Sequence, residues 1–100
     1  MYLDVCGGTD ADNNNVAQYK GNSTVSQDFK LEQSSTGNGY ILRAQVGGKT
    51  RVLDIYKTNG RVENGNNVQI FRNTDPLAQE WLIIPVSQFT TKGLLKSVDA

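Results

Sequence analysis

The chain has 100 residues and a mass of 11.0 kDa, which is the size of a single domain over residues 1–100. Its ten Lys and Arg side chains balance ten Asp and Glu side chains, so the formal net charge is zero. This balance argues against nucleic acid and anionic membranes as partners, because both attract basic surfaces. No apolar run approaches the roughly 20 residues that a membrane-spanning helix needs, so membrane insertion is not expected.

The first part of the chain reads as short strands separated by polar turns. Apolar and polar residues alternate over a few positions in each strand, and Gly, Asp, Asn and Ser fill the segments between them. Strands are predicted over residues 2–5, 16–20 and 29–33. A flexible connector is expected over residues 34–39.

One polar loop imitates the start of a calcium-binding loop. Asp10, Asp12 and Asn14 have the spacing of its first ligands. Asn15 and Gly21 stand where such a loop needs a glycine and a glutamate, so a solvated loop is the better interpretation. Neither a metal nor a cofactor is predicted for this chain.

The second part of the chain repeats the strand pattern. A hairpin is predicted for residues 40–46 and 49–55, because Gly47 and Gly48 supply the positive φ of a tight turn. Further strands are predicted over residues 67–71 and 79–83, with Trp81 and Ile83 directed inward. No segment shows helical periodicity of useful length.

The two parts match each other in three places. Leu3-Asp4-Val5 corresponds to Leu53-Asp54-Ile55 at an offset of 50. Residues 15–19 and 27–31 correspond to residues 67–71 and 79–83 at an offset of 52. Such a repeat of strand-rich units indicates that each unit buries its apolar face against a copy.

The order of these motifs resembles the ricin-B-type lectin family, whose hallmark is a repeated Gln-x-Trp. Gln79-x-Trp81 is the full motif and Gln27-x-Phe29 is a variant. The resemblance covers about residues 2–85 and implies an all-β, β-trefoil-like fold built from repeated four-stranded lobes. About two of the three lobes are expected, so the trefoil is expected to be incomplete. Their ranges are about 2–33 for repeat one, about 40–85 for repeat two and 87–100 for a partial third repeat.

Cys6 is the single cysteine, so no intrachain disulfide is possible. In this respect the chain resembles bacterial members of the family, and Cys6 is expected to be a small, partly buried apolar residue. A catalytic thiol is not expected, because the chain has no histidine to activate it. The resemblance implies a secreted protein, although no signal peptide precedes Tyr2.

The resemblance also implies one shallow sugar site on each lobe. An aspartate accepts hydrogen bonds from sugar hydroxyls, an aromatic ring stacks on the apolar face of the sugar, and amides complete the site. The first lobe offers Asp4, Tyr19 and Asn22. The second lobe offers Asp54, Gln69, Phe71 and Asn73.

Alternatives remain for most of these residues. Asp4 and Asp54 have the strand parity that faces away from the core, but they are also suited to accept backbone hydrogen bonds from the following loop. Tyr19 and Phe71 are candidates for partly buried packing. The amides of Gln27 and Gln79 are interpreted mainly as satisfying loop backbone at the border of each site. Gln27 and Gln79 are nevertheless included among the candidate carbohydrate-binding residues.

The chain departs from the family pattern at three positions. Ser26 and Ala78 replace the amide that precedes the Gln of the motif, and Ala17 replaces the polar residue that Gln69 provides in the second lobe. Each lobe therefore lacks one or two expected contacts. Because Ala78 has no polar side-chain atom, the second lobe can bind in the manner of the family only if Asn73 substitutes for the missing amide.

The sequence thus predicts non-catalytic binding of galactose-type or related glycans, which would target a linked glycosidase or toxin to those glycans. The alternative is a trefoil that binds protein, as an inhibitor or a toxin-complex subunit. Glycoside hydrolysis is not expected, because Asp4 and Asp54 belong to different lobes and a hydrolase needs two facing carboxylates. The incomplete third lobe predicts either self-association, with exchange of Ser87–Ala100, or a longer parent polypeptide. The alternative is that this tail folds back and fills the place of the missing first strand.

Overall fold

The computed structural model describes residues 1–74 and 76–85, and it confirms an all-β fold. Its six strands are β1 (Tyr2–Val5), β2 (Asn14–Tyr19), β3 (Phe29–Gln33), β4 (Tyr40–Ala44), β5 (Arg51–Ile55) and β6 (Val68–Arg72). The helical elements are the 3-10 turns η1 (Cys6–Gly8) and η2 (Val25–Gln27) and the short helix α1 (Pro76–Gln79). No helix in the described residues is long and apolar enough to cross a membrane. The predicted partial third repeat, residues 87–100, lies outside the described residues.

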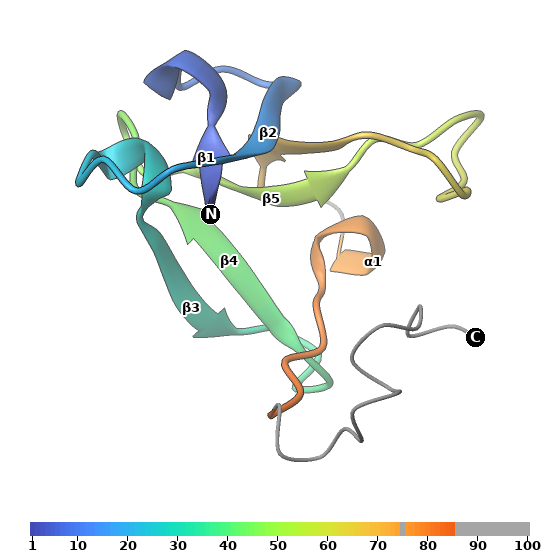
Figure 1. The fold of residues 1–100 in the computed structure, drawn as a ribbon. Helices are drawn as coiled ribbons and strands as arrows, with labels where there is room; N and C mark the ends of the chain where they lie inside the picture. Colours follow the sequence, from blue (N-terminus) through green and yellow to red (C-terminus); the bar gives the residue numbers. More distant parts are fainter. Residues whose placement is uncertain (75, 86–100) are drawn as a thin grey trace.

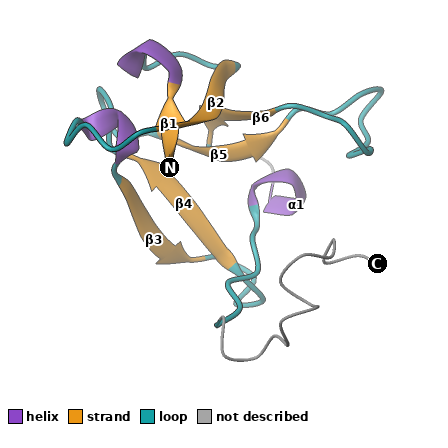
Figure 2. Ribbon diagram, viewed as in Figure 1, coloured by secondary structure: helices purple, strands orange, loops and turns teal. Residues whose placement is uncertain are grey.

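The strands form one antiparallel sheet in the order β1-β2-β6-β5-β4-β3. Figure 1 shows that the sheet curls, with the β3–β4 ribbon turned away from the β1–β2 and β5–β6 hairpins. The two hairpins are the corresponding parts of the two repeats, and they join where Asn14 and Asn15 pair with Ile70 and Gln69. The two repeats therefore lie side by side in one continuous sheet (Figure 2).

The core lies at the centre of this curl. Its buried apolar residues come from β1, β2, β5 and β6, from the end of β4 and from the turn after β4: Val5, Val16, Ala44, Val46, Leu53 and Ile70. Phe29, Leu42, Val68 and Trp81 pack against them from the rim. Val52, Leu53 and Asp54 of β5 are all buried, whereas the alternating sequence predicts one exposed face. The burial follows from position, because β5 is an interior strand of the sheet between β6 and β4 and helix α1 also lies against it.

The predicted hairpin at Gly47 and Gly48 is present, with strands slightly shorter than expected. Gly47 has a φ of +55°, and a Cβ there would lie 2.1 Å from Oδ2 of Asp10. Glycine is therefore required both by the backbone conformation and by the close approach of Asp10. The backbone N–H of Gly48 donates to that same Oδ2 over 3.0 Å.

Arg51 ties the polar loop of the first repeat to the hairpin of the second. Its guanidinium contacts Oδ1 of Asp10 and Oδ1 of Asp12, each over 2.8 Å. Arg72 adds a contact of 3.1 Å to Oδ2 of Asp12. The bond from Gly48 and then the bond from Arg51 lower the pKa of Asp10. Asp10 and Asp12, whose spacing imitates a calcium loop, therefore form salt bridges with arginine side chains in this fold.

The strand predicted over residues 79–83 does not form. Helix α1 ends at Gln79, and Trp81 makes only an isolated bridge with Tyr40. Ile83, expected to point inward, is 48% exposed. Trp81 does pack against the core, and its Nε1–H donates to the carbonyl of Leu53 over 3.1 Å. The indole of Trp81 thus anchors this segment to the core, and the apolar side chains that follow it, Leu82, Ile83 and Ile84, are exposed to solvent.

Candidate functional site

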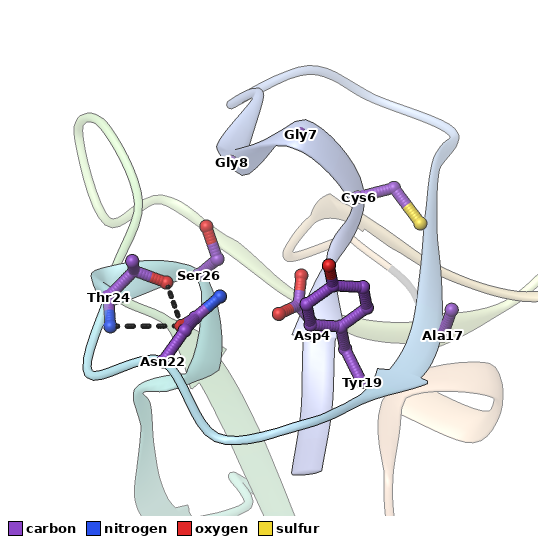
Figure 3. Close-up of a pocket in the computed structure, with 9 residues that line it drawn as sticks. All are labelled: Asp4, Cys6, Gly7, Gly8, Ala17, Tyr19, Asn22, Thr24 and Ser26. Atoms are coloured by element: carbon purple, nitrogen blue, oxygen red, sulfur yellow. Dashed lines mark hydrogen bonds between the residues drawn. The ribbon is translucent and has the colours of Figure 1, made fainter. Parts of the chain in front are cut away.

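The first pocket lies over the β1–β2 hairpin and has a volume of about 390 Å³. Asp4 comes from β1, Ala17 and Tyr19 from the same face of β2, and the remaining residues from the two 3-10 turns and the loop before η2. The lining residues, drawn in Figure 3, are Asp4, Cys6, Gly7, Gly8, Ala17, Tyr19, Asn22, Thr24 and Ser26.

Asp4 is the charged group at the base of this pocket, and only 9% of it is exposed. Its Oδ2 accepts a hydrogen bond of 2.8 Å from Nε2 of Gln27. Oδ1 accepts none within the described residues, and it is not sealed from solvent. The amide of Gln27 therefore fixes the carboxylate, and one oxygen remains available to a ligand hydroxyl.

Asn22 presents its amide on the opposite rim. Its Oδ1 accepts from the backbone N–H and the hydroxyl of Thr24, over 3.2 and 2.8 Å. These bonds leave Nδ2 as the free end of the amide, directed into the pocket in Figure 3. Beside it, a Cβ on Gly8 would lie 2.8 Å from Oγ of Ser26, so a bare backbone is needed at this wall.

The second pocket repeats this plan over the β5–β6 hairpin, with a volume of about 310 Å³. Asp54 is 6% exposed, and its Oδ2 accepts 2.9 Å from Nε2 of Gln69. Its Oδ1 is again without a partner in the described part of the chain. The same Nε2 donates to Oδ1 of Asn13, which comes from the first repeat. The lining residues are Asn13, Asp54, Ile55, Tyr56, Lys57, Gln69, Phe71 and Thr74.

Each pocket has an aromatic ring at the end of its second strand. Tyr19 is 52% exposed and lies beside Asp4 in Figure 3. Phe71 is half-buried, and the guanidinium of Arg72 lies 5.3 Å from its ring centre. A free acceptor beside a ring that is at least partly exposed suits a ligand that has hydroxyls on its edge and C–H groups on its face.

The amides of Gln27 and Gln79 make the same contacts 52 positions apart. Oε1 of Gln27 accepts from the N–H of Asn22, and its Nε2 donates to the carbonyl of Lys20. Oε1 of Gln79 accepts from the N–H of Thr74, and its Nε2 donates to the carbonyl of Arg72. Both glutamines thus close the turn that borders a pocket, as expected from the sequence.

Comparison with known proteins identifies this repeated plan. The sequence profile described as "ricin-type beta-trefoil lectin domain-like" matches residues 1–71. The chain belongs to this ricin-type lectin-like family. A search of curated proteins finds no match.

One solved structure supports the trefoil assignment of this ricin-type chain. It is described as a designed 3-fold symmetric protein, ThreeFoil, and it superposes with a TM-score of 0.70 at 28% identity. The match covers 84% of the present chain and 56% of ThreeFoil. The chain therefore spans little more than half the length of that structure, in agreement with an incomplete trefoil.

The ricin-type chain brings most of the sequence-predicted residues into two groups. Asp4, Tyr19 and Asn22 line the first pocket. The second pocket is lined by Asp54, Gln69 and Phe71. Gln27 does not line the first pocket, but its amide donates a hydrogen bond to Asp4 at the base of that pocket.

Asn73 is placed differently from the expectation. It lines a neighbouring polar hollow with Gln33 and Gln79, and Thr74 takes the place in the second pocket that corresponds to Asn22. Glu80 lies in the same hollow, where hydrogen bonds from Ser34 and then Thr36 lower its pKa. Asn73 therefore does not line the second pocket.

Sequence reasoning missed several residues that line the pockets. The repeat could have identified Thr74, because the offset of 52 pairs it with Asn22. Tyr56 and Lys57 follow the Leu-Asp-Ile run as Cys6 and Gly7 follow Leu-Asp-Val, so the repeat also marks them. Asn13 has no such signal, because it reaches the second pocket only through the β2–β6 pairing.

Proposed function

We propose that the chain binds carbohydrate, without catalysis, through the two pockets at Asp4 and Asp54. The observation that carries the proposal is the repeated arrangement of a nearly buried aspartate, held by one glutamine, with one oxygen left free beside an aromatic ring. A fixed acceptor next to an apolar platform is suited to a sugar ring. Membership of a lectin-like family supports the same conclusion.

The arrangement supports binding better than hydrolysis. Each pocket contains a single aspartate, and no second carboxylate lines either pocket within the described residues. Glycoside hydrolysis generally requires a pair of carboxyl groups within about 10 Å of each other across the bond that is cleaved. We propose that Asp4 and Asp54 act instead as separate hydroxyl acceptors in two binding sites.

A glycan array tests this proposal directly. Labelled wild-type protein is expected to bind galactose-type or related glycans, and the matched Asp4→Asn, Asp54→Asn double variant is expected to lose that binding. Asparagine keeps an oxygen for the supporting glutamine and replaces the free acceptor with a donor. Equal signals from both proteins, or no signal from folded wild type, would contradict the proposal.

Protein binding is the second candidate, and one observation favours it. Leu82, Ile83 and Ile84 form a consecutive run of exposed apolar side chains after Trp81. Contiguous exposed apolar surface is typical of protein contact sites. A glycan array that stays blank, together with retained binding to a protein partner that Leu82→Ser abolishes, would favour this candidate over sugar binding.

We further propose a targeting role in a secreted protein, in which the pockets deliver a linked glycosidase or toxin to glycans. The family membership supports this role. Adding the chain to a reporter enzyme is expected to retain that enzyme on glycan-coated beads, and the double variant is the control.

A further inference from the structure

We propose that the second pocket is a composite site, in which Asn13 of the first repeat donates a hydrogen bond from Nδ2 to a hydroxyl of the bound sugar. The inference rests on the proposed sugar binding and adds a contact residue to one of the two sites. Asn13 belongs to the loop between β1 and β2, whereas every other lining residue of this pocket belongs to the second repeat.

Main-chain contacts hold Asn13 beside the second pocket. Its backbone N–H donates to the carbonyl of Ile70 over 3.0 Å, where Asn14 pairs with Ile70. Oδ1 of the preceding residue, Asp12, accepts 3.1 Å from the backbone N–H of Arg72. None of these bonds uses the side chain of Asn13. The amide is therefore placed at the pocket before any ligand arrives, which lowers the ordering cost of binding.

Asn13 also has a backbone conformation that glycine adopts most easily. Its φ is +66°, in the left-handed region. At the offset of 52, the corresponding residue of the second repeat is Gly65, with a φ of +83°. Glycine satisfies this turn without the cost that a side chain brings, and asparagine tolerates it better than most residues. A side chain retained in this conformation points to a role for the side chain itself.

The protein uses only one end of the Asn13 amide. Oδ1 accepts 3.1 Å from Nε2 of Gln69, and the same Nε2 donates to Asp54. Nδ2 makes no hydrogen bond within the described residues, and Asn13 is exposed where it lines the pocket. Because Gln69 fixes the oxygen end, the NH2 end is directed away from Gln69 and stays available to a ligand.

The first pocket obtains its free amide from its own repeat. All of its lining residues lie between positions 4 and 26, and Nδ2 of Asn22 is directed into it. In the second pocket Thr74 takes the place of Asn22, and the NH2 group of Gln69 is committed to Asn13 and Asp54. Asn13 therefore supplies the amide donor that the second repeat does not.

Amide NMR titration with galactose tests this contact. Shifts at Cys6 and Asn22 report the first pocket, and shifts at Tyr56 and Phe71 report the second. Asn13→Gly is expected to raise the Kd of the second pocket about five-fold, as for one hydrogen bond, and to leave the Kd of the first within about two-fold. The positive φ suits glycine, so the variant is expected to fold.

Gly65→Asn is the matched control. It makes the reverse exchange at the corresponding position of the second repeat, where an added Cβ would have open space. Gly65 lines neither pocket. Both Kd values are therefore expected to stay within about two-fold of wild type, which is less than the loss of one hydrogen bond in the Asn13 variant.

Monodeoxygalactoses separate a direct contact from a positioning role, because loss of the Asn13 side chain also releases Gln69. The second pocket of wild type is expected to bind one of them, which lacks the hydroxyl that Nδ2 contacts, about five-fold more weakly than galactose. In Asn13→Gly that ratio is expected to fall to about two-fold or less, since removal of either partner removes the same interaction. A role through Gln69 alone would weaken every sugar by the same factor.

The possible failures are distinguishable. If Asn13→Gly leaves the Kd of the second pocket unchanged, or weakens all the sugars there equally, the composite site is wrong while sugar binding stands. Shifts at the first pocket alone would also overturn it. If galactose shifts neither set of signals, the proposed galactose-type binding fails, and the composite site fails with it.

Discussion

At the residue scale, the two aspartates differ from ordinary surface carboxylates. Asp4 and Asp54 are almost covered by protein, yet each keeps one oxygen without a protein partner in the described residues. Burial of an unpaired charge is costly, so such an oxygen favours a ligand that donates a hydrogen bond to it. The glutamine beside each carboxylate fixes its direction in advance and lowers the ordering cost of binding.

Asp54→Asn is expected to weaken sugar binding at the second pocket more than ten-fold. The bond from Gln69 is kept, but the outer oxygen becomes an NH2 group, and a hydrogen bond to a charged group is worth about 1.5–3 kcal/mol. Phe71→Ala is expected to have an effect of similar size, because it removes the ring beside the acceptor. Titration calorimetry with the best array ligand measures both. Unchanged affinity in both variants would show that the second pocket is not the site.

Trp81 contributes to stability through both its ring and its N–H. The indole packs against the core and donates to the carbonyl of Leu53 over 3.1 Å. Trp81→Phe is expected to cost about 1 kcal/mol, for the lost hydrogen bond, and Trp81→Ala about 3–5 kcal/mol. Urea unfolding followed by circular dichroism gives both values. Equal stability of all three proteins would mean that this segment is not anchored by the indole.

At the element scale, the two hairpins are joined by charge as well as by backbone pairing. The loop between β1 and β2 contributes Asp10 and Asp12, and β5 contributes Arg51, which contacts both. Because residues about 40 positions apart are held together, this cluster fixes how the repeats lie against each other. The neighbouring pocket at Asp54 depends on that placement, since Asn13 reaches it from the same loop.

This cluster predicts a pH dependence of stability. The pKa of Asp10 is lowered in the folded chain, first by the N–H of Gly48 and then by Arg51, whereas an unfolded aspartate titrates near a pH of about 3.9. A lowered pKa stabilises the fold above the unfolded value, and that contribution is lost as the pH falls through the folded value. Asp10→Asn is therefore expected to be less stable than wild type at neutral pH.

The difference should disappear in acid, where both side chains are uncharged. Unfolding by urea at neutral pH and well below the pKa of Asp10 measures it. A stability difference that is the same at both pH values would show that the charge of Asp10 is not the cause.

Sequence reasoning predicts some of these strands with their bounds, but agreement between local pattern and repeat is not sufficient by itself. The strands at residues 2–5 and 29–33 have the expected bounds, because alternation and flanking turn residues define them. Residues 79–83 fail, because an isolated bridge and one indole hydrogen bond replace a strand ladder there. The repeat places Asp4 and Asp54, but Asn13 reaches its pocket through pairing between the repeats, which no local pattern encodes.

At the scale of the whole molecule, the chain matches 56% of a designed three-fold trefoil, and β1 and β3 are the outer strands of the described sheet. Exposed strand edges and apolar side chains such as Leu82 and Ile83 promote association between chains. We therefore expect the apparent mass in light scattering to rise with concentration. A mass that stays at that of one chain up to high concentration would contradict this expectation.

The central claim is that both lobes bind sugar through their aspartates, and amide NMR of the labelled chain tests it most directly. Addition of the best array ligand is expected to shift residues of the first pocket, such as Cys6 and Asn22, and of the second pocket, such as Tyr56 and Phe71. Asp4→Asn should remove the first set of shifts and Asp54→Asn the second. Shifts confined to other surfaces, or shifts that persist in the double variant, would contradict the claim.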